Sequence, residues 1–384
     1  MRIALVSDTY TPQVNGVTTV VARIAQVLRD FGHAVVIVAP RYPGNGADPP
    51  SSELRIPSAA FPPYPAIRLS VPQFGAVSRY LDAFEPHVVH VATEGPLGLT
   101  GRRYAVRRHI PLITSYHTNF PQYARHYGAG TFEPLVWKWL RWFHRPAVLT
   151  QTPGEAVRDE LERRGIGRPV VWGRGVDTAH FHPAKRSAGW RRWLAGGDDT
   201  AIVLHVGRLA PEKNIGVLAE AWIAARERVG QRATFVLAGE GPETRRLLTQ
   251  LPWVRQLGFL DRARLAAVYG SADICVLPSR TETCGLVALE AMASGLAVVA
   301  ADAGGFRESI THGRSGVLVP PDDATGFAAE ILALVIAPRR RAEMATAARA
   351  AAVARDVAPE NIALLQQYAG AAGISVPGAA PCAA

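Results

Sequence analysis

Strand-like apolar runs alternate with amphipathic helical runs along almost the whole chain. Six runs rich in β-branched and apolar residues lie in the first half: 2–7, 34–39, 87–92, 111–115, 147–151 and 169–172. Five more follow residue 200: 201–206, 233–238, 274–278, 297–301 and 316–319. The residues between them include a helical pattern over 19–31 with one apolar face. Such alternation predicts parallel sheets flanked by helices.

The length of 384 residues exceeds what one hydrophobic core usually serves, so the sequence predicts two domains. We expect an α/β chain with two Rossmann-like domains facing across a cleft, at 1–172 and 187–355. A stretch punctuated by glycine and proline, 173–186, is the expected linker. A helix over 356–370 is expected to cross back to the first domain. The Ala-, Gly- and Pro-rich residues 371–384 are expected to form a flexible tail.

The net charge of +10 is uneven, because residues 1–176 carry +8 and residues 177–384 carry +2. A basic surface suits nucleic acid, an anionic membrane or an acidic acceptor, and the motifs of nucleic-acid-binding modules are missing. Three isolated cysteines give neither a disulfide framework nor metal spacing. The chain enters a strand at once and has no apolar stretch of 18 residues, so we expect a cytoplasmic protein, with at most peripheral attachment to the inner face of the plasma membrane.

A helix is predicted to begin near residue 283. Thr283 is a suitable N-cap and Gly295 a suitable stop. The backbone amides of Cys284, Gly285 and Leu286 are then expected to lie unpaired at the positive end of the helix dipole. Phosphate oxygens bind well at such a position, so the sequence predicts an anion site there.

Two glutamates eight residues apart straddle this helix start. Glu282 precedes the helix and is expected to lie beside the anion site. Glu290 lies about 9 Å further along the axis, far enough from the anion site to accept hydrogen bonds from two hydroxyl groups. The alternative is that both acids are solvated on a surface helix, but apolar Val287, Leu289 and Met292 surround Glu290 and argue against it.

Two cations follow the predicted strand 201–206. Arg208 and Lys213 lie beyond its carboxyl end, where ligands gather in open α/β sheets. The chain has 39 arginines and only three lysines, so a lysine in this loop is less easily ascribed to composition. A lysine ammonium suits the charge of a leaving diphosphate. The alternative is a pair of solvated loop cations.

The segments 281–290 and 207–214 resemble the C-terminal half of the retaining glycosyltransferases of family 4, in which the first Glu of an E-x7-E motif faces the donor hexose and the second binds the ribose. The segment 174–183 is similar to that family's hinge region, so the resemblance covers nearly the whole chain. It implies a GT-B fold and a hexosyltransferase using a nucleotide-diphosphate sugar. Glu282 and Glu290 take the two roles of the motif in this chain.

Further residues take their roles from the same resemblance. Gly16, just before the first helix, is expected to approach the donor diphosphate. Gly239 begins half of a Gly-x-Gly-x-x-Gly motif and, with Gly258, is assigned to the nucleotide. His117, in the segment 115–119, is expected to contact the transferring hexose, with a histidine that merely ends a strand as the alternative.

Three polar residues at predicted strand ends are expected on the acceptor side. His90 lies near the end of the predicted strand 87–92, Glu94 follows that strand, and Asn119 follows the strand 111–115.

A membrane contact is predicted for the helix over 133–145. Its apolar face at 100° per residue comprises Leu135, Val136, Trp139, Leu140 and Phe143. The opposite face holds Trp137, Lys138, Arg141 and Arg145, with Trp142 at its edge. Tryptophan among basic residues suits a headgroup boundary, and the arginines at 102, 103, 107 and 108 add attraction to anionic lipid. The alternative is a packed helix whose tryptophans cover neighbouring loops.

The donor most consistent with the resemblance is GDP-mannose, as in bacterial α-mannosyltransferases, and the expected acceptor is a hydroxyl of a lipid or glycan in envelope biosynthesis. A UDP-glucose-type glycolipid glucosyltransferase is the alternative, because the base cannot be read from side chains. A sugar-nucleotide epimerase or a phosphorylase is a rival on the same frame, although no lysine follows Lys213 to hold pyridoxal phosphate. The chain has no Asp-x-Asp, so we expect neither a metal nor another cofactor.

Overall fold

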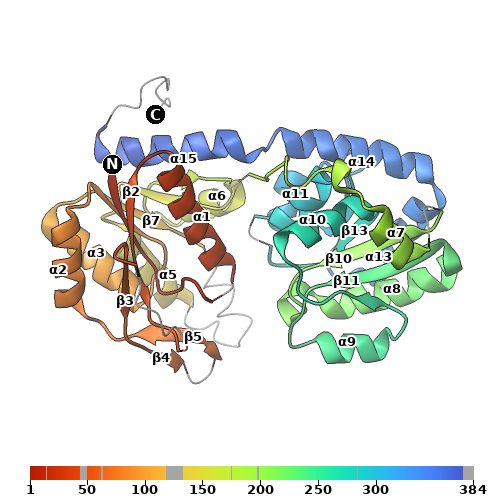
Figure 1. Ribbon diagram of the computed structural model, residues 1–384, viewed down its shortest axis with the longest axis horizontal. Helices are drawn as coiled ribbons and strands as arrows, with labels where there is room; N and C mark the ends of the chain where they lie inside the picture. Colours follow the sequence, from red (N-terminus) through yellow and green to blue (C-terminus); the bar gives the residue numbers. More distant parts are fainter. Residues whose placement is uncertain are drawn as a thin grey trace. The chain divides into compact units, whose positions relative to one another are not determined.

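The computed structural model describes most of the chain and divides it into two compact units. The described residues are 1–13, 15–43, 50–61, 64–117, 133–173, 175–196, 199–282 and 284–374, with backbone alone for residues 61 and 64–67. The first unit comprises Met1–Trp172 and Asn361–Ala384, and the second comprises Gly173–Glu360. Each unit contains a parallel sheet packed with helices (Figure 1), which confirms the predicted α/β class.

The sheet of the first unit has seven parallel strands among the described residues, in the order β3-β2-β1-β6-β7-β8-β9. They are β1 (Arg2–Val6), β2 (Ala34–Pro40), β3 (Glu53–Ile56), β6 (Val88–Val91), β7 (Leu112–Ser115), β8 (Leu149–Thr152) and β9 (Pro169–Val171). A separate antiparallel pair is formed by β4 (Ser58–Phe61) and β5 (Tyr64–Ser70). All six strands predicted in this half are present, whereas β3, β4 and β5 were not predicted.

Helices cover this sheet, and the last of them comes from the end of the chain. They are α1 (Gly16–Asp30), α2 (Phe74–Phe84), α3 (Pro96–Arg108), α5 (Glu133–His144), α6 (Glu155–Arg163) and α15 (Val357–Ala372). Asn15 caps α1, because its Oδ1 accepts a hydrogen bond from the amide of Thr18 at 2.8 Å. The buried stripe of α1, including Ile24 and Leu28, packs on the sheet.

The second unit contains a sheet of six parallel strands in its described part, in the order β12-β11-β10-β13-β14-β15. They are β10 (Ala201–Val206), β11 (Ala233–Ala238), β12 (Arg255–Gln256), β13 (Ile274–Leu277), β14 (Ala297–Ala301) and β15 (Val317–Val319). The helices are α7 (Ala188–Ala195), α8 (Ile215–Val229), α9 (Thr244–Gln250), α10 (Arg262–Ser271), α11 (Leu286–Ala293), α12 (Phe306–Ser309), α13 (Ala324–Ile336) and α14 (Pro338–Val353). The strand order reverses between β10 and β13, so a ligand site is expected at the carboxyl ends of these two strands.

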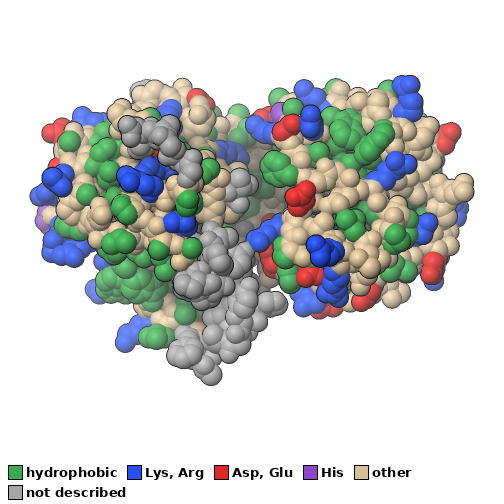
Figure 2. All heavy atoms as spheres, turned by 60° about the horizontal axis from the view of Figure 1, so that its bottom comes forward, with side chains coloured by type: hydrophobic (Ala, Val, Ile, Leu, Met, Phe, Trp, Pro, Cys, Tyr) green, Lys and Arg blue, Asp and Glu red, His purple; other side chains and the backbone are tan. Residues whose placement is uncertain are grey.

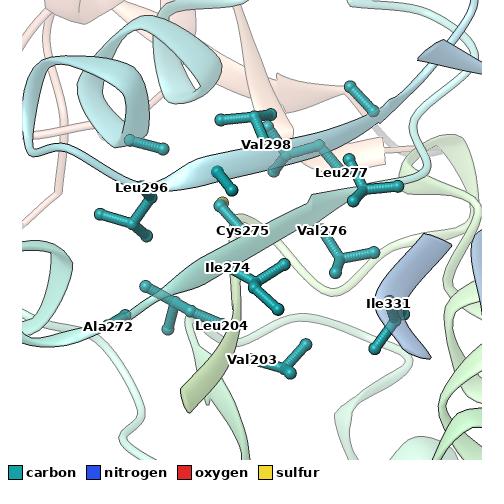
Figure 3. Packing of buried hydrophobic residues seen from close by; sticks show 14 of the residues in the cluster. Val203, Leu204, Ala272, Ile274, Cys275, Val276, Leu277, Leu296, Val298 and Ile331 are labelled. Carbon is teal, nitrogen blue, oxygen red and sulfur yellow. The ribbon is translucent and has the colours of Figure 1, made fainter. Parts of the chain in front are cut away.

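The core of the second unit is apolar on both faces of its central strands. All four residues of β13 are buried, and Figure 3 shows Ile274, Cys275 and Val276 among the neighbouring side chains of β10 and β14. Burial raises the pKa of the Cys275 thiol, so this cysteine is a packing residue rather than a nucleophile.

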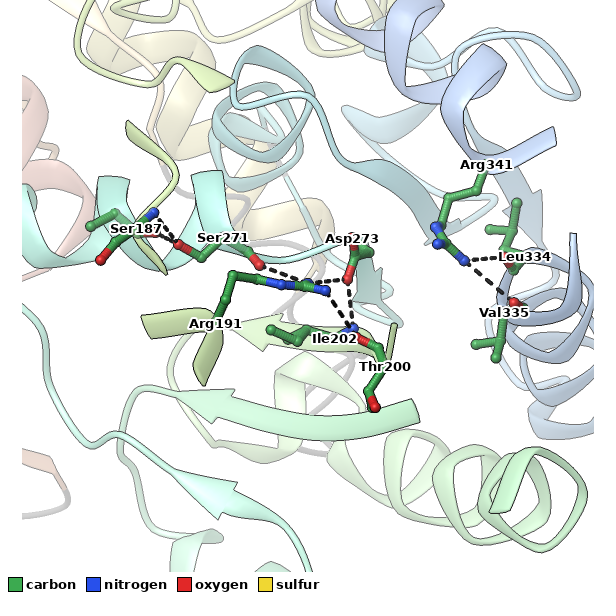
Figure 4. A network of polar contacts seen from close by, with 10 residues as sticks. Ser187, Arg191, Thr200, Ile202, Ser271, Asp273, Leu334, Val335 and Arg341 are labelled. Atoms are coloured by element: carbon green, nitrogen blue, oxygen red, sulfur yellow. Dashed lines mark hydrogen bonds and ion pairs between the residues drawn. The ribbon is translucent and has the colours of Figure 1, made fainter. Parts of the chain in front are cut away.

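A polar cluster fixes the opposite, amino-terminal end of β10 and β13 (Figure 4). The guanidinium of Arg191 donates to Asp273 Oδ2 at 2.5 Å, to Ser271 O at 3.1 Å and to Thr200 O at 3.0 Å. The amide of Ile202 donates to the same Asp273 oxygen at 2.8 Å. The buried arginine is therefore paired as well as hydrogen-bonded, and it holds the start of two strands whose other ends carry the site.

The segment that follows β9 belongs to the second unit and is tied to residues near α14 and α15. The amide of Val176 donates to Arg355 O at 3.0 Å, and the amide of Val357 donates to Val176 O at 3.0 Å. Thr178 donates its hydroxyl and its amide to Asp356 Oδ2. From Asn361 onward the chain packs with the first unit.

Candidate functional site

Two loops of the second unit pack closely at the carboxyl ends of β10 and β11. The amide of Leu209 donates to Glu240 O at 3.1 Å, and the amide of Glu243 donates to Leu209 O at 2.9 Å. Gly239 has a φ of 129°, and a Cβ on it would lie 2.0 Å from Gly207 O. Glycine at 239 is therefore required for the contact between the loops, which gives its half-motif a structural reason.

Gly258 lies at the same carboxyl end of the sheet, next to Gly239. Its carbonyl accepts the amide of Gly239 at 2.8 Å, its φ is 66°, and a Cβ on it would lie 2.9 Å from Glu240 Oε1. The two glycines assigned to the nucleotide thus lie next to each other, beside the loop that carries Arg208 and Lys213.

Lys213 and Glu282 come together at this edge, although 69 residues separate them. Lys213 Nζ lies 2.6 Å from Glu282 Oε2, and the side chains are 27% and 17% exposed. The amide of Lys213 donates to Ala210 O at 2.9 Å, and the carbonyl of Glu282 accepts the amide of Gly305 at 2.8 Å. The two loops are tied at a second point, because the hydroxyl of Thr281 donates to Glu212 O at 3.3 Å.

The helix predicted near residue 283 begins later than expected. Residue 283, the predicted N-cap Thr283, lies outside the described residues. The helix α11 starts at Leu286, after Gly285 with a φ of 67°, and Cys284 precedes it with Sγ 3.5 Å from Gly173 O. The prediction that Cys284 and Gly285 belong to the first helical turn is therefore wrong. The first helical amides are those of Leu286 and Val287, since the amide of Ala288 already donates to Gly285 O.

Glu290 lies on α11 and faces α10. The hydroxyl of Tyr269 donates to Glu290 Oε2 and to Val287 O, both at 3.4 Å. Burial raises the pKa of Glu290 to about 7, although Tyr269 and Arg262 act in the opposite direction. Glu290 is partly buried on α11 and contacts Tyr269, so it is not a fully solvated surface acid.

His205 lies near the carboxyl end of β10 and was not predicted as a site residue. It is buried in β10, and its Nδ1 donates to Val276 O at 2.8 Å. Burial lowers the pKa of His205 to about 4, so the imidazole is neutral and its Nε2 is an acceptor. Among the described residues no donor reaches Nε2, and the position of a Cβ on Gly207 lies 3.7 Å from it. A histidine inside an apolar strand, just before a basic loop, is the sequence signal that points to it.

The first unit presents two of the predicted residues at strand ends and helix starts. Gly16 is exposed at the first position of α1, and a Cβ on it would meet no described atom within 4 Å. His117 follows β7 and is partly buried. Asn119 lies outside the described residues. Backbone approach to Gly16 is therefore open, as its predicted role requires.

His90 and Glu94 are not available on the acceptor side, contrary to the prediction. The ring of His90 is fully buried, with one nitrogen joined to Tyr368 Oη and the other to Ser115 Oγ. Burial lowers the pKa of His90 to about 3. Glu94 is also buried, with its Oε1 3.5 Å from Nε2 of the buried His144. Both residues fasten structural elements, His90 by fixing α15 to the sheet of the first unit.

The helix α5 buries one of the tryptophans predicted on its basic face. Trp137 is only 6% exposed, and its Nε1 donates to Glu133 Oε1 at 3.1 Å, so its predicted membrane contact is wrong. Trp142, predicted at the edge of that face, is 47% exposed, and Leu135 and Trp139, predicted on the apolar face, are 63% and 38% exposed. Lys138 and Arg141 of α5 and Arg145, which follows its last residue, are exposed as well. Basic side chains lie among hydrophobic ones on the face of the first unit that Figure 2 shows.

Two further observations concern the described ranges only. No helix in them is both long enough and apolar enough to cross a bilayer. No three histidine, cysteine, aspartate or glutamate side chains of those ranges lie where they would hold a metal ion together.

Comparison with known proteins identifies the family of both halves. Residues 14–180 match the family model described as Glycosyltransferase Family 4, and residues 200–336 match the model described as Glycosyl transferases group 1. The chain is 37% identical over 366 residues to a GDP-mannose-dependent alpha-mannosyltransferase of Mycolicibacterium smegmatis, covering 92% of this chain and 93% of that protein. It is 31% identical to a sulfoquinovosyl transferase of Arabidopsis thaliana, covering 91% of this chain and 69% of that protein.

Solved structures show the same fold at low sequence identity. A sucrose-phosphate synthase from Thermosynechococcus elongatus aligns with a TM-score of 0.76 at 20% identity, covering 96% of this chain and 98% of that one. HepE of Anabaena, in complex with UDP, aligns with a TM-score of 0.77 at 21% identity, covering 96% of this chain and all of that one. The chain therefore belongs to glycosyltransferase family 4 and is a hexosyltransferase with the GT-B fold.

Proposed function

We propose that the protein transfers mannose from GDP-mannose to a hydroxyl group of a lipid or glycan. The transfer of a hexosyl group from a nucleotide-diphosphate sugar follows from the family. The choice of mannose is supported by relatives named GDP-mannose-dependent alpha-mannosyltransferase at 30% to 37% identity over most of the chain. The proposal rests on the position of three residues in the second unit, Lys213, Glu282 and Glu290. They bring one cation and two carboxylates together near the carboxyl ends of β10 and β13, where the strand order reverses.

The cations and amides of the second unit suit the diphosphate. Arg208 and Lys213 lie in one loop, and the amides of Leu286 and Val287 stand at the positive end of α11. When the bond between the anomeric carbon and the diphosphate breaks, its electron pair passes to the diphosphate oxygen. The cations stabilise this growing charge, and loss of one such donor typically lowers the rate by about 10²–10³-fold.

The carboxylates suit the two sugars of the donor. Glu290 lies about one turn along α11 from its start at Leu286, and its oxygens are acceptors for ribose hydroxyls. Glu282 lies before the helix and is assigned to the transferring hexose. We assign Glu282 an orienting role at the sugar and not that of a nucleophile. The family resemblance alone assigns His117 to the hexose and Gly16 to the diphosphate.

A second donor class has its own support. Relatives at 25% to 31% identity include the sulfoquinovosyl transferase and two alpha-monoglucosyldiacylglycerol synthases. A UDP-sugar donor with a glycolipid product is therefore the second candidate. The comparisons give no support to an epimerase.

An anionic membrane surface is the proposed place of the acceptor. The rings of Trp139 and Trp142 lie 5.1 Å apart on α5, and the guanidinium of Arg102 lies 3.9 Å from the ring of Trp142. With Leu135 and Lys138, they form an exposed surface that combines apolar, aromatic and basic groups. Such a combination suits the headgroup region of a bilayer, where aromatic rings and lysine stems are partly immersed.

Saturation-transfer NMR with GDP and with UDP tests the donor directly. The proposal predicts stronger transfer from the protein to guanosine protons than to uridine protons at equal concentration. The Lys213→Ala variant should lower the signal of the preferred nucleotide. A clear preference for UDP would replace GDP-mannose by the second candidate, and no signal from either would contradict the proposed donor class.

A further inference from the structure

The ion pair between Lys213 and Glu282 joins two groups that the proposed reaction assigns to different parts of the donor. Lys213 is assigned to the diphosphate and Glu282 to the hexose, yet their charged atoms lie 2.6 Å apart. Both side chains are largely shielded from solvent, so their attraction is weakened less than that of a surface pair.

The loops that carry the pair hold it in place from both sides. Glu282 is fixed by the hydrogen bond from the amide of Gly305 to its carbonyl, and a Cβ on Gly304 would lie 2.1 Å from that carbonyl. Ser279 and Thr281 both donate their hydroxyls to Glu212 O, next to Lys213 in the chain. The contact is therefore part of the loop packing and not an accident of two long side chains.

We infer that Glu282 and the diphosphate of the donor compete for the ammonium group of Lys213, so that the diphosphate must displace Glu282 before this carboxylate can contact the hexose. This inference rests on the proposed function and adds a second role to Glu282. A carboxylate oxygen and a phosphate oxygen compete for the same ammonium protons. A diphosphate carries more negative charge than one carboxylate, and Arg208 and the amides of α11 add to its binding, so the donor wins the exchange.

The exchange makes the contact with the sugar conditional on the diphosphate. If Glu282 turned away when a ligand without phosphate bound, Lys213 would lose its ion-pair partner. Such a ligand therefore does not displace Glu282 from Lys213. A nucleotide-diphosphate sugar satisfies Lys213 and frees Glu282 beside the hexose. Glu282 is thus a specificity-determining residue for the phosphate part of the donor as well as for its sugar.

The inference predicts that removal of the Glu282 carboxylate tightens nucleotide binding instead of weakening it. Isothermal titration calorimetry with bare GDP and bare UDP is carried out on wild type, Glu282→Gln, Lys213→Ala and the double variant. Because Glu282→Gln removes the competitor and the bare nucleotides have no hexose, we expect it to tighten binding of the preferred nucleotide by about threefold to tenfold. The same variant should transfer sugar more slowly than wild type.

The double variant and a charge control separate competition from general repulsion. In the Lys213→Ala background, Glu282→Gln should change the affinity by less than about twofold, because the shared cation is gone. Asp322→Asn removes an exposed carboxylate of the same unit, which pairs with Arg280, and should leave the affinity unchanged.

The outcomes distinguish the inference from the function on which it rests. If wild type binds a nucleotide diphosphate and Glu282→Gln binds it no more tightly, the inference is wrong and the donor class stands. Tightening that persists in the Lys213→Ala background also overturns it. If wild type binds neither GDP nor UDP, the proposed donor class is wrong and the inference falls with it.

Discussion

The hydroxyl of Tyr269 lies 3.4 Å from Oε2 of Glu290, so a fully buried phenol of α10 donates toward the carboxylate assigned to the ribose. The contact fixes the carboxylate on α11 but does not offset the loss of its hydration, since burial still raises the pKa of Glu290 to about 7. Ionisation of Glu290 therefore lowers the stability of the fold at neutral and higher pH.

The first prediction concerns the pH dependence of stability in Glu290→Gln. The pKa of Glu290 is about 7 in the fold and 4.5 in its ordinary state, so the folded protein binds the proton more tightly than the unfolded chain. The contribution of Glu290 to the free energy of unfolding is therefore highest below pH 4.5 and falls until about pH 7. Glutamine does not ionise, so the variant should exceed wild type in stability by about 1–3 kcal/mol at pH 8 and match it near pH 4.5.

Urea unfolding of both proteins at several pH values measures this difference. The same variant should transfer sugar at least about tenfold more slowly, because an amide replaces a charged acceptor. A stability difference that is independent of pH would show that Glu290 ionises normally in the fold.

The strands that are covered on both faces were predicted from the sequence, whereas the shorter peripheral strands were not. All eleven strands expected from apolar runs are present, because strands covered on both faces need continuous apolar residues. The strands β3 and β12 and the pair of β4 and β5 were missed, since polar residues interrupt or make up their pattern. Phe31, expected on the apolar face of α1, is 51% exposed at its C-cap, where the helical period no longer holds.

The second prediction concerns His117. Replacement by alanine should lower transfer by about tenfold to a hundredfold and change the affinity for bare GDP by less than about twofold, because the assigned contact is to the hexose or acceptor. Calorimetry and initial rates separate the two effects. His87→Ala, at an exposed histidine of the same unit, should change neither. A large loss of GDP affinity would move His117 out of the sugar position.

The third prediction is that transfer does not depend on a divalent metal. The chain lacks an Asp-x-Asp, and Arg208 and Lys213 are the cations assigned to the leaving diphosphate. Treatment with EDTA followed by desalting should leave the initial rate within about twofold of the untreated enzyme. Strict dependence on added Mn²⁺ or Mg²⁺ would contradict this assignment of charge.

The fourth prediction concerns the exposed surface of α5. Trp139→Ser/Trp142→Ser should weaken binding to vesicles containing anionic lipid by about tenfold or more, because it removes the two rings that suit the headgroup region. Co-sedimentation at graded anionic content and salt measures the loss. Trp193→Ser is the matched control, since Trp193 is 53% exposed in the other unit. Binding that ignored lipid charge and the double substitution would favour an acceptor in solution.

The positions of the candidate residues after β10 and around the start of α11 were predictable from type and spacing, but their pairing was not. The contact of Lys213 with Glu282 exists because β10 and β13 are neighbours, and the contact of His90 with Tyr368 spans 278 residues. The burial of Trp137 could not be predicted from the sequence either. Apolar residues lie on several sides of α5, and tertiary packing decides which side faces the core. The helix start was misplaced by a capping rule that favours Thr283, whereas Gly285 adopts a positive φ just before the helix.

The most direct test is transfer of labelled mannose from GDP-mannose into vesicles of a total bacterial lipid extract. Wild type should incorporate the label, and Lys213→Ala should do so at least about tenfold more slowly while remaining folded. Lys185→Ala removes an exposed lysine of the same unit and should keep the wild-type rate. Incorporation that survives Lys213→Ala unchanged, or no incorporation from either GDP-mannose or UDP-glucose, would contradict the account.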